Sequence, residues 1–297
     1  MEKQVYFYSD WLRLSGTFYT PDDYKKGEKR PAIICVHGYS GRRNVYMPPF
    51  SNGFMKKGYV VLAFFHRGFG DSEGIRTRNI PMEQVRDILH AITFMQQCPE
   101  VDPERVGLLG LSFGGATVVY AAAIDQRVRC TVEIGGLADG ERWMKSKRTH
   151  WQWLRFMDEL KEDRIRRVMT GQSKRLPYLE LCPTGPGMTE ILQTTIKPGE
   201  QYAEGYPLEN VDEALNFKVE PLIHLISPRA VLFIHAERDE MVAVDEARIM
   251  YAKAGDPKKL VIIPEINHAE VYEPVNPEIF RNIVMKETLK WYDKYLK

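Results

Sequence analysis

Short apolar runs of strand length alternate with longer helical patterns through most of this 297-residue chain. Strands separated by helices pair in parallel, and a near-continuous apolar run is typical of a strand covered on both faces. The alternation therefore predicts an α/β fold with a mostly parallel central sheet flanked by helices. The first core strands are expected at Ala32–His37, Tyr59–Phe65, Val106–Leu109 and Cys130–Ile134.

Helices are expected near Pro48–Lys57, at Pro81–Gln97 and at Gly114–Ala123. The second of these begins with a proline and ends before Cys98-Pro99, and both are favourable boundary signals. The start of the chain follows another pattern. Val5–Tyr8 and Arg13–Tyr19 alternate polar and apolar residues, which predicts an antiparallel hairpin at the edge of the sheet.

The alternation of strands and helices stops between residues 139 and 221 and then resumes. This segment has no run of β character, and its first half is helical in pattern. The chain therefore divides into a core, residues 1–138 and 222–297, and an insertion, residues 139–221. The second part of the core is expected to hold a strand at Ala230–His235, a helix at Val244–Ala254, a strand at Leu260–Ile263 and a closing helix from Pro277.

The charge balance restricts the partners. With 41 Lys+Arg against 40 Asp+Glu the formal net charge is +1, which gives no long-range field to hold a polyanion, so nucleic acid is not expected as a partner. Residues 141–175 nevertheless hold 11 basic and five acidic side chains, a local excess of +6. A solvated helix face accounts for this excess. If it faces a pocket instead, a carboxylate-bearing substrate would follow.

Membrane association is not expected either. The sequence has no run of about 18 apolar residues and no apolar signal core at its N-terminus. A cytoplasmic location is therefore the default expectation, and a homo-oligomer is left open.

A candidate nucleophile lies in Gly110-Leu111-Ser112-Phe113-Gly114, which matches the pattern G-x-S-x-G. The pattern directly follows an apolar strand and opens a helix of small residues. A nucleophile elbow needs this context, because the serine occupies a strained turn whose neighbours two residues away must be small. Gly110 and Gly114 meet that requirement, so Ser112 is the predicted nucleophile.

A serine nucleophile needs a base, usually histidine, that is oriented by a carboxylate. Four histidines follow Ser112, and His268 alone lies in a loop after the last expected strand. Asp239 follows the strand before it and is the predicted acid, with Glu237 as the alternative because the loop phase is ambiguous. For the oxyanion, backbone N–H groups are expected from Phe113 and from Tyr39, which follows a His-Gly turn.

Taken together, these segments resemble the α/β-hydrolases over residues 5–138 and 222–297. The resemblance is carried by Ser112, Asp239, His268, His37-Gly38 and Arg67-Gly68-Phe69-Gly70-Asp71-Ser72. Gly110–Gly115 and Asn267–Tyr272 are most similar to the esterase, dienelactone hydrolase and prolyl-oligopeptidase-type branch. This implies a serine hydrolase whose insertion is a cap. His66 departs from the acidic or aromatic residue that often precedes Arg-Gly there, so the role of the Arg67 loop is open.

The resulting hypothesis is a serine esterase that hydrolyses a small carboxylic ester through an acyl-enzyme, with no metal or organic cofactor. The cap would set substrate choice. Its aromatic residues are candidates to line an acyl site, although their helical spacing equally fits the cap's own core: Trp143, Trp151, Trp153 and Phe156.

Two rival functions are considered. The same triad cleaves amides, so a peptidase or acylaminoacyl-type hydrolase acting on short peptides is the first rival. Such peptidases usually carry a large N-terminal domain, whereas about 30 residues precede the first core strand here, and this favours the esterase. A noncatalytic ligand-binding protein is the second rival, and the apparently intact triad argues against it.

Overall fold

A computed structural model describes residues 1–195 and 205–297. Its main sheet is built from β1 (Glu2–Ser9), β2 (Leu12–Tyr19), β3 (Arg30–Val36), β4 (Val60–Phe64), β5 (Val101–Leu111), β6 (Val128–Ile134), β9 (Ala230–Ala236) and β10 (Lys258–Ile263). The strand order is β1-β2-β4-β3-β5-β6-β9-β10, antiparallel for β1–β2 and β2–β4 and parallel elsewhere. This confirms the predicted mostly parallel sheet with an antiparallel hairpin at its edge.

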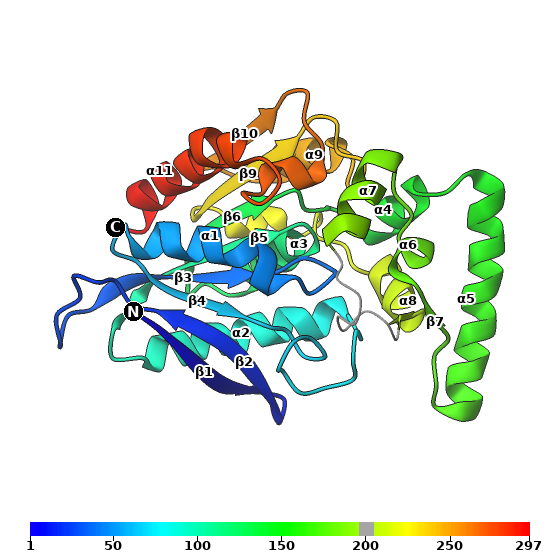
Figure 1. Cartoon of the computed structure of the whole chain (residues 1–297), viewed down its shortest axis with the longest axis horizontal. Coiled ribbons are helices and arrows are strands. Elements are labelled where there is room, and N and C mark those ends of the chain that lie inside the picture. The colour runs from blue at the N-terminus through cyan, green and yellow to red at the C-terminus, as the bar shows by residue number, and fades with distance from the viewer. Residues whose placement is uncertain (196–204) are drawn as a thin grey trace.

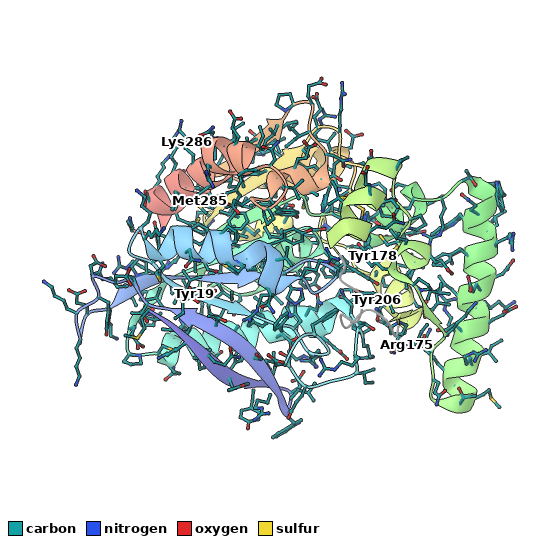
Figure 2. All side chains as sticks on the ribbon, viewed as in Figure 1. Tyr19, Arg175, Tyr178, Tyr206, Met285 and Lys286 are labelled. Carbon is teal, nitrogen blue, oxygen red and sulfur yellow. The ribbon has the colours of Figure 1, made fainter. Side chains whose placement is uncertain are left out.

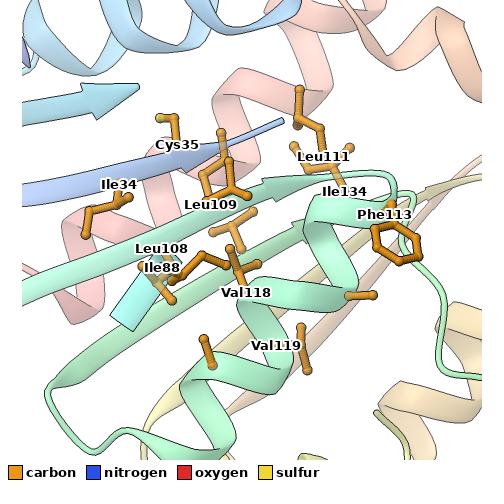
Figure 3. Close-up of a cluster of buried hydrophobic side chains, with 14 of the residues drawn as sticks. Ile34, Cys35, Ile88, Leu108, Leu109, Leu111, Phe113, Val118, Val119 and Ile134 are labelled. Atoms are coloured by element: carbon orange, nitrogen blue, oxygen red, sulfur yellow. The ribbon is translucent and has the colours of Figure 1, made fainter. Parts of the chain in front are cut away.

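Helices cover both faces of the sheet (Figure 1). The helices of the core are α1 (Arg43–Met55), α2 (Pro81–Gln97), α3 (Phe113–Ile124), α9 (Asp245–Lys253), α10 (Pro277–Ile279) and α11 (Lys286–Tyr295), with 3-10 turns η1 (Ile223–Ile226) and η2 (His268–Val271) and the π-helical turn η3 (Phe280–Met285). Figure 3 shows Leu108 and Leu109 pointing to opposite sides of β5, where Leu108 faces Ile88 of α2. Burial on both faces explains why these strands are continuously apolar.

Two elements begin five residues earlier than predicted. Helix α1 begins at Arg43, before the expected start at Pro48, because the buried Arg43 guanidinium donates to the Ala63 carbonyl (2.7 Å) and fixes the first turn. Strand β5 begins at Val101 rather than Val106, because Val101 pairs with Arg30 beyond a register shift. Both extensions depend on contacts between distant segments.

The segment between β6 and β9 is mainly helical, as predicted. It contains α4 (Gly140–Ser146), α5 (His150–Thr170), α6 (Tyr178–Leu181), α7 (Pro186–Thr195) and α8 (Glu209–Leu215), together with strands β7 (Arg175–Leu176) and β8 (Tyr206–Pro207). Strands β7 and β8 form an antiparallel pair of two residues each, which is too short to leave a run of β character in the sequence. Residues 196–204 of the predicted cap lie outside the described residues.

Buried polar contacts attach the insertion to the core. The Glu246 carboxylate of α9 accepts hydrogen bonds from Arg142 Nε (2.5 Å) and from the backbone N–H of Ala138 (2.8 Å). Asn210 of α8 donates from Nδ2 to the Thr77 carbonyl (2.8 Å). Because Glu246 and Asn210 are themselves buried, these bonds hold the insertion against the edge of the sheet where the parallel strands end.

Aromatic rings complete this junction. Figure 2 shows Tyr178 and Tyr206 close together where the insertion meets the core, and their ring centroids lie 5.5 Å apart. Among the described helices, none combines the length and the apolar character that crossing a membrane requires.

Candidate active site

Ser112 occupies the sharp turn between β5 and α3. Its backbone has φ 53° and ψ −125°, a conformation that L-residues rarely adopt outside functional turns. A Cβ at Gly110 would collide with the Gly114 carbonyl, and a Cβ at Gly114 would collide with the His37 carbonyl. The local sequence therefore permits this strained turn because both positions are glycine.

His268 and Asp239 lie in loops that follow the neighbouring parallel strands β10 and β9. The His268 Nδ1–H donates to Asp239 Oδ2 at 2.6 Å, and both side chains are buried. The second oxygen, Asp239 Oδ1, accepts the backbone N–H groups of Met241 and Val242, each at 2.7 Å. The structure thus brings Asp239 and His268 together.

The alternative acid, Glu237, occupies a different environment. It is exposed, and its carboxylate accepts the Glu265 N–H at 3.2 Å. Asp239 is buried, which by itself would raise its pKa, but the His268 and His235 imidazoles and their hydrogen bonds hold that pKa well below its ordinary value. Asp239 therefore stays ionised beside His268.

The two expected oxyanion donors flank the serine. Phe113 is the first residue of α3, so the helix leaves its backbone N–H without an internal acceptor. On the other side, a Cβ at Gly38 would come within 3.1 Å of Ser112 Cβ, so the loop carrying Tyr39 lies directly against the serine. The Tyr39 carbonyl accepts Asn79 Nδ2 (2.9 Å), which fixes that loop.

His37 orients the same loop and is not a base. Its Nδ1–H donates to the Gly38 carbonyl (2.8 Å), and its Nε2 accepts the His66 N–H (3.2 Å). Burial lowers the pKa of His37 to about 3, so the ring is neutral near neutral pH, as this pair of bonds requires.

The Arg67 loop, whose role was open, is held by a buried ion pair. Arg67 Nη2 lies 2.6 Å from Asp87 Oδ1, and the Arg67 backbone N–H donates to Asp87 Oδ2 (3.1 Å). The same carboxylate contacts His66 Nδ1 at 3.3 Å. His66 therefore has a structural partner in this sequence, and the loop is fixed on the core side of the site.

A second buried pair of titratable residues, Glu133 and His235, lies behind Asp239, and the sequence analysis missed it. His235 donates from Nε2 to the Val242 carbonyl (2.9 Å), and the same nitrogen is 3.3 Å from Asp239 Oδ2. Burial raises the pKa of Glu133 to about 7. Burial would lower the pKa of His235, but its bond to Asp239 and the nearby Glu133 raise it. The sequence signal that could have revealed this pair is Glu133 itself, a glutamate inside an otherwise apolar strand end.

Ser112 and His268 line one cavity, together with Tyr39. The remaining wall is mostly apolar or aromatic and includes Tyr46, Met47, Leu111, Met241 and Tyr272 from the core and Tyr178, Met188 and Leu192 from the insertion. Within the described part of the chain, Arg42 is the one Lys or Arg in this wall, and no carboxylate lines it. The eleven basic residues at 141–175 are absent from the same wall.

The aromatic residues expected at the substrate site lie elsewhere. Trp143 packs behind the elbow, with its ring centroid 5.7 Å from that of Phe113. Trp153 and Phe156 are buried on the inner face of α5, whereas Trp151 is 58% exposed. Among the described residues that line the cavity, none of these four appears.

Metal ligands are the remaining chemistry to consider. In residues 1–195 and 205–297, no three His, Cys, Asp or Glu side chains are grouped so that they could hold a metal ion.

The sheet, its helices and the elbow serine define an α/β hydrolase of the serine-hydrolase class. A solved structure described as the α/β hydrolase GrgF from Penicillium sp. superposes with a TM-score of 0.81 at 20% identity, covering 100% of this chain and 99% of that one. Residues 10–176 match the family described as X-Pro dipeptidyl-peptidase (S15 family). The chain therefore belongs to the S15 family.

Two curated proteins illustrate its relatives. An Escherichia coli protein, described as an uncharacterized 31.7 kDa protein in the traX-finO intergenic region, is 30% identical over 90% of this chain and 92% of its own length. A protein of Aspergillus aculeatus named thiohydrolase aneE is 37% identical over 127 residues, covering 42% of this chain and 38% of that protein.

Proposed function

We propose that this protein hydrolyses carboxylic esters through an acyl-enzyme on Ser112. In this mechanism His268 removes the Ser112 proton and returns it to the leaving alcohol, while Asp239 orients and stabilises the imidazolium. The Tyr39 and Phe113 N–H groups stabilise the oxyanion. Water then attacks the acyl-enzyme with the same base. The observation that carries the proposal is one cavity lined by Ser112 and His268, with Asp239 2.6 Å behind the histidine.

The acyl group is proposed to be apolar, and the insertion to act as a cap over it. The apolar and methionine side chains of the wall support this, since such walls favour alkyl or aryl groups and adapt to their shape. Tyr178, Met188 and Leu192 are the insertion's contribution, so the acyl preference should depend on α6 and α7.

A dipeptide substrate is disfavoured by the charge of the same wall. The free α-amino group of an X-Pro peptide is largely protonated near neutral pH. Its binding calls for a carboxylate, whereas the described wall has none and carries the buried cation of Arg42. We therefore favour esters over X-Pro amides despite the name of the family.

A thioester is the second candidate substrate, favoured by the similarity to the protein named thiohydrolase. The acyl-enzyme step is the same, with a thiol as the leaving group in place of an alcohol.

The test compares three substrates: a p-nitrophenyl ester, an N-acetylcysteamine thioester of the same acyl group, and Gly-Pro p-nitroanilide. Ester turnover with no anilide turnover is expected. Efficient anilide cleavage would overturn the proposal, and a thioester kcat/KM well above that of the ester would select the second candidate. Covalent labelling of the wild type, but not Ser112→Ala, by a fluorophosphonate would exclude a noncatalytic binding protein.

A further inference from the structure

Helix α5 has apolar side chains on two opposite faces. The inner face packs on the rest of the protein through Trp153, Phe156 and Leu160, which are buried. On the rest of the helix, five large apolar side chains are between 53% and 86% exposed: Trp151, Leu154, Ile165, Val168 and Met169. Figure 1 shows α5 as the outermost helix of the insertion, with one side turned away from the body. These five side chains form two exposed apolar groups, one near each end of α5, and exposed apolar surface of this kind marks a candidate interaction site.

The spacing of this outer face is that of a coiled-coil seam. Steps of three and four residues alternate along six exposed positions, Trp151, Leu154, Asp158, Lys161, Ile165 and Val168. We call these six positions the α5 seam. Alternation of three and four keeps a narrow stripe facing one partner helix. The seam is apolar at both ends and carries one acid and one base at its centre.

The α5 seam is complementary to itself when two copies run antiparallel. With a two-fold axis between positions 158 and 161, Leu154 of one copy faces Ile165 of the other. In the same register Asp158 faces Lys161 twice, once on each side of the axis. Trp151 then faces Val168, so every layer of the seam is matched.

The flanking charges agree with this register. Arg155 and Glu162 border the seam on one side and would meet across the axis. Within the described residues, Asp158, Lys161 and Glu162 have no ion-pair partner, although other charges of α5 do, such as Arg164 with Asp212 and Arg167 with Asp163. These three charges, which find no ion-pair partner inside one chain, are therefore ones that a second chain would pair in this register.

We propose that the α5 seam binds the α5 seam of a second copy of this chain, forming an antiparallel, two-fold symmetric homodimer. A parallel pair would place Asp158 against Asp158, and a membrane surface would leave this acid and Lys161 unpaired inside the apolar stripe. A 21-residue helix is about 32 Å long, so the interface is at the small end for a specific dimer. Dissociation in the micromolar range is expected.

Charge reversal at the centre of the seam tests both the partner and the register. In a dimer of Asp158→Lys, each new lysine would face Lys161 of the other copy. In a dimer of Lys161→Asp, each new aspartate would face Asp158 of the other copy. Each single variant should therefore be monomeric. Mixed together, the two variants should form a heterodimer, because every central pair is again opposite in charge. The double variant Asp158→Lys/Lys161→Asp should restore the homodimer. Sedimentation velocity from about 1 to 200 µM, spanning the expected range, measures each case.

Arg166→Glu is the matched control, because it reverses an exposed charge of α5 outside the seam and should leave the dimer intact. Thermal melts of every variant separate loss of pairing from loss of folding. A wild-type protein that stays monomeric at 200 µM would overturn the proposal. So would single variants that dimerise as the wild type does, or a mixture of them that stays monomeric.

Discussion

The charged side chains beside the candidate site lie in a different environment from most ion pairs of the insertion. Beside the candidate site the core buries Glu133, His235 and Asp239 almost completely. In the insertion several ion pairs are partly exposed, as for Lys174 with Glu159. Burial makes the pKa of a charged group sensitive to each neighbouring charge and hydrogen bond. Exposed ion pairs, in contrast, contribute little to the free energy of unfolding.

This difference separates the two tasks of a hydrolase. The proposed proton transfer needs groups whose charge and orientation are fixed, and its candidate residues follow β5, β9 and β10 of the core. Under the proposed function substrate choice depends on the shape of the cavity, to which the insertion contributes apolar side chains such as Met188. We therefore expect core substitutions to change rate and pH dependence, and insertion substitutions to change which acyl groups are accepted.

The largest effect is expected from removing the nucleophile. Ser112→Ala should lower kcat for a p-nitrophenyl ester by about 10⁶, because no other group in the elbow forms the acyl-enzyme. A hydrolysis assay that follows p-nitrophenol release measures this fall in kcat, and a thermal melt shows whether the variant is folded. Retention of normal turnover would mean that the chemistry lies outside the β5–α3 elbow, and the division between core and insertion would fail.

The next largest effect should distinguish the two acids of the β9 loop. Asp239→Asn should lower kcat by about 10⁴, because the amide favours the wrong tautomer of His268. Glu237→Gln is the matched control and should change kcat less than about twofold, since its carboxylate contacts the exposed Glu265 backbone. If Glu237→Gln were the more damaging variant, Glu237 rather than Asp239 would be the acid that orients His268.

The buried pair behind Asp239 should appear in the stability of the protein. The pKa of Glu133 is raised from 4.5 to about 7, so the folded state holds this proton more tightly than the unfolded state does. The free energy of unfolding should therefore fall as pH rises from about 4.5 to about 7, by about 3 kcal/mol. The raised pKa of His235 acts in the same direction.

Glu133→Gln should flatten this decline, measured as urea midpoints between pH 4.5 and 8. Thr131→Val is the control, because Thr131 is buried on the same strand and titrates nothing. An undiminished slope in Glu133→Gln would show that the dependence arises elsewhere. Two groups also face this pair: His268 through Asp239, and the Tyr272 phenol, whose pKa is raised by burial.

The fold could be predicted because its strands are buried on both faces, a property that each strand shows in its own sequence. The loop positions of Ser112, Asp239 and His268 followed from strand order, since parallel strands end at one edge of the sheet. The features that could not be predicted depend on contacts between segments that are distant in the sequence. Nothing in the sequence around Met188 or Leu192 indicates that α7 turns toward the serine. The helical spacing of Trp153 and Phe156 is the same whether the two side chains pack in a core or line a pocket.

The smallest effect tests the insertion directly. Met188 is buried in the cavity wall, so Met188→Ala should lower kcat/KM for a hexanoyl ester roughly tenfold relative to an acetyl ester, because only the longer chain reaches the missing side chain. Trp151→Ala is the matched variant, since Trp151 lies on the outer face of α5 and should leave the acyl profile unchanged. If instead Trp151→Ala altered the profile and Met188→Ala did not, substrate choice would depend on α5, and the cavity wall described here would not be the acyl site.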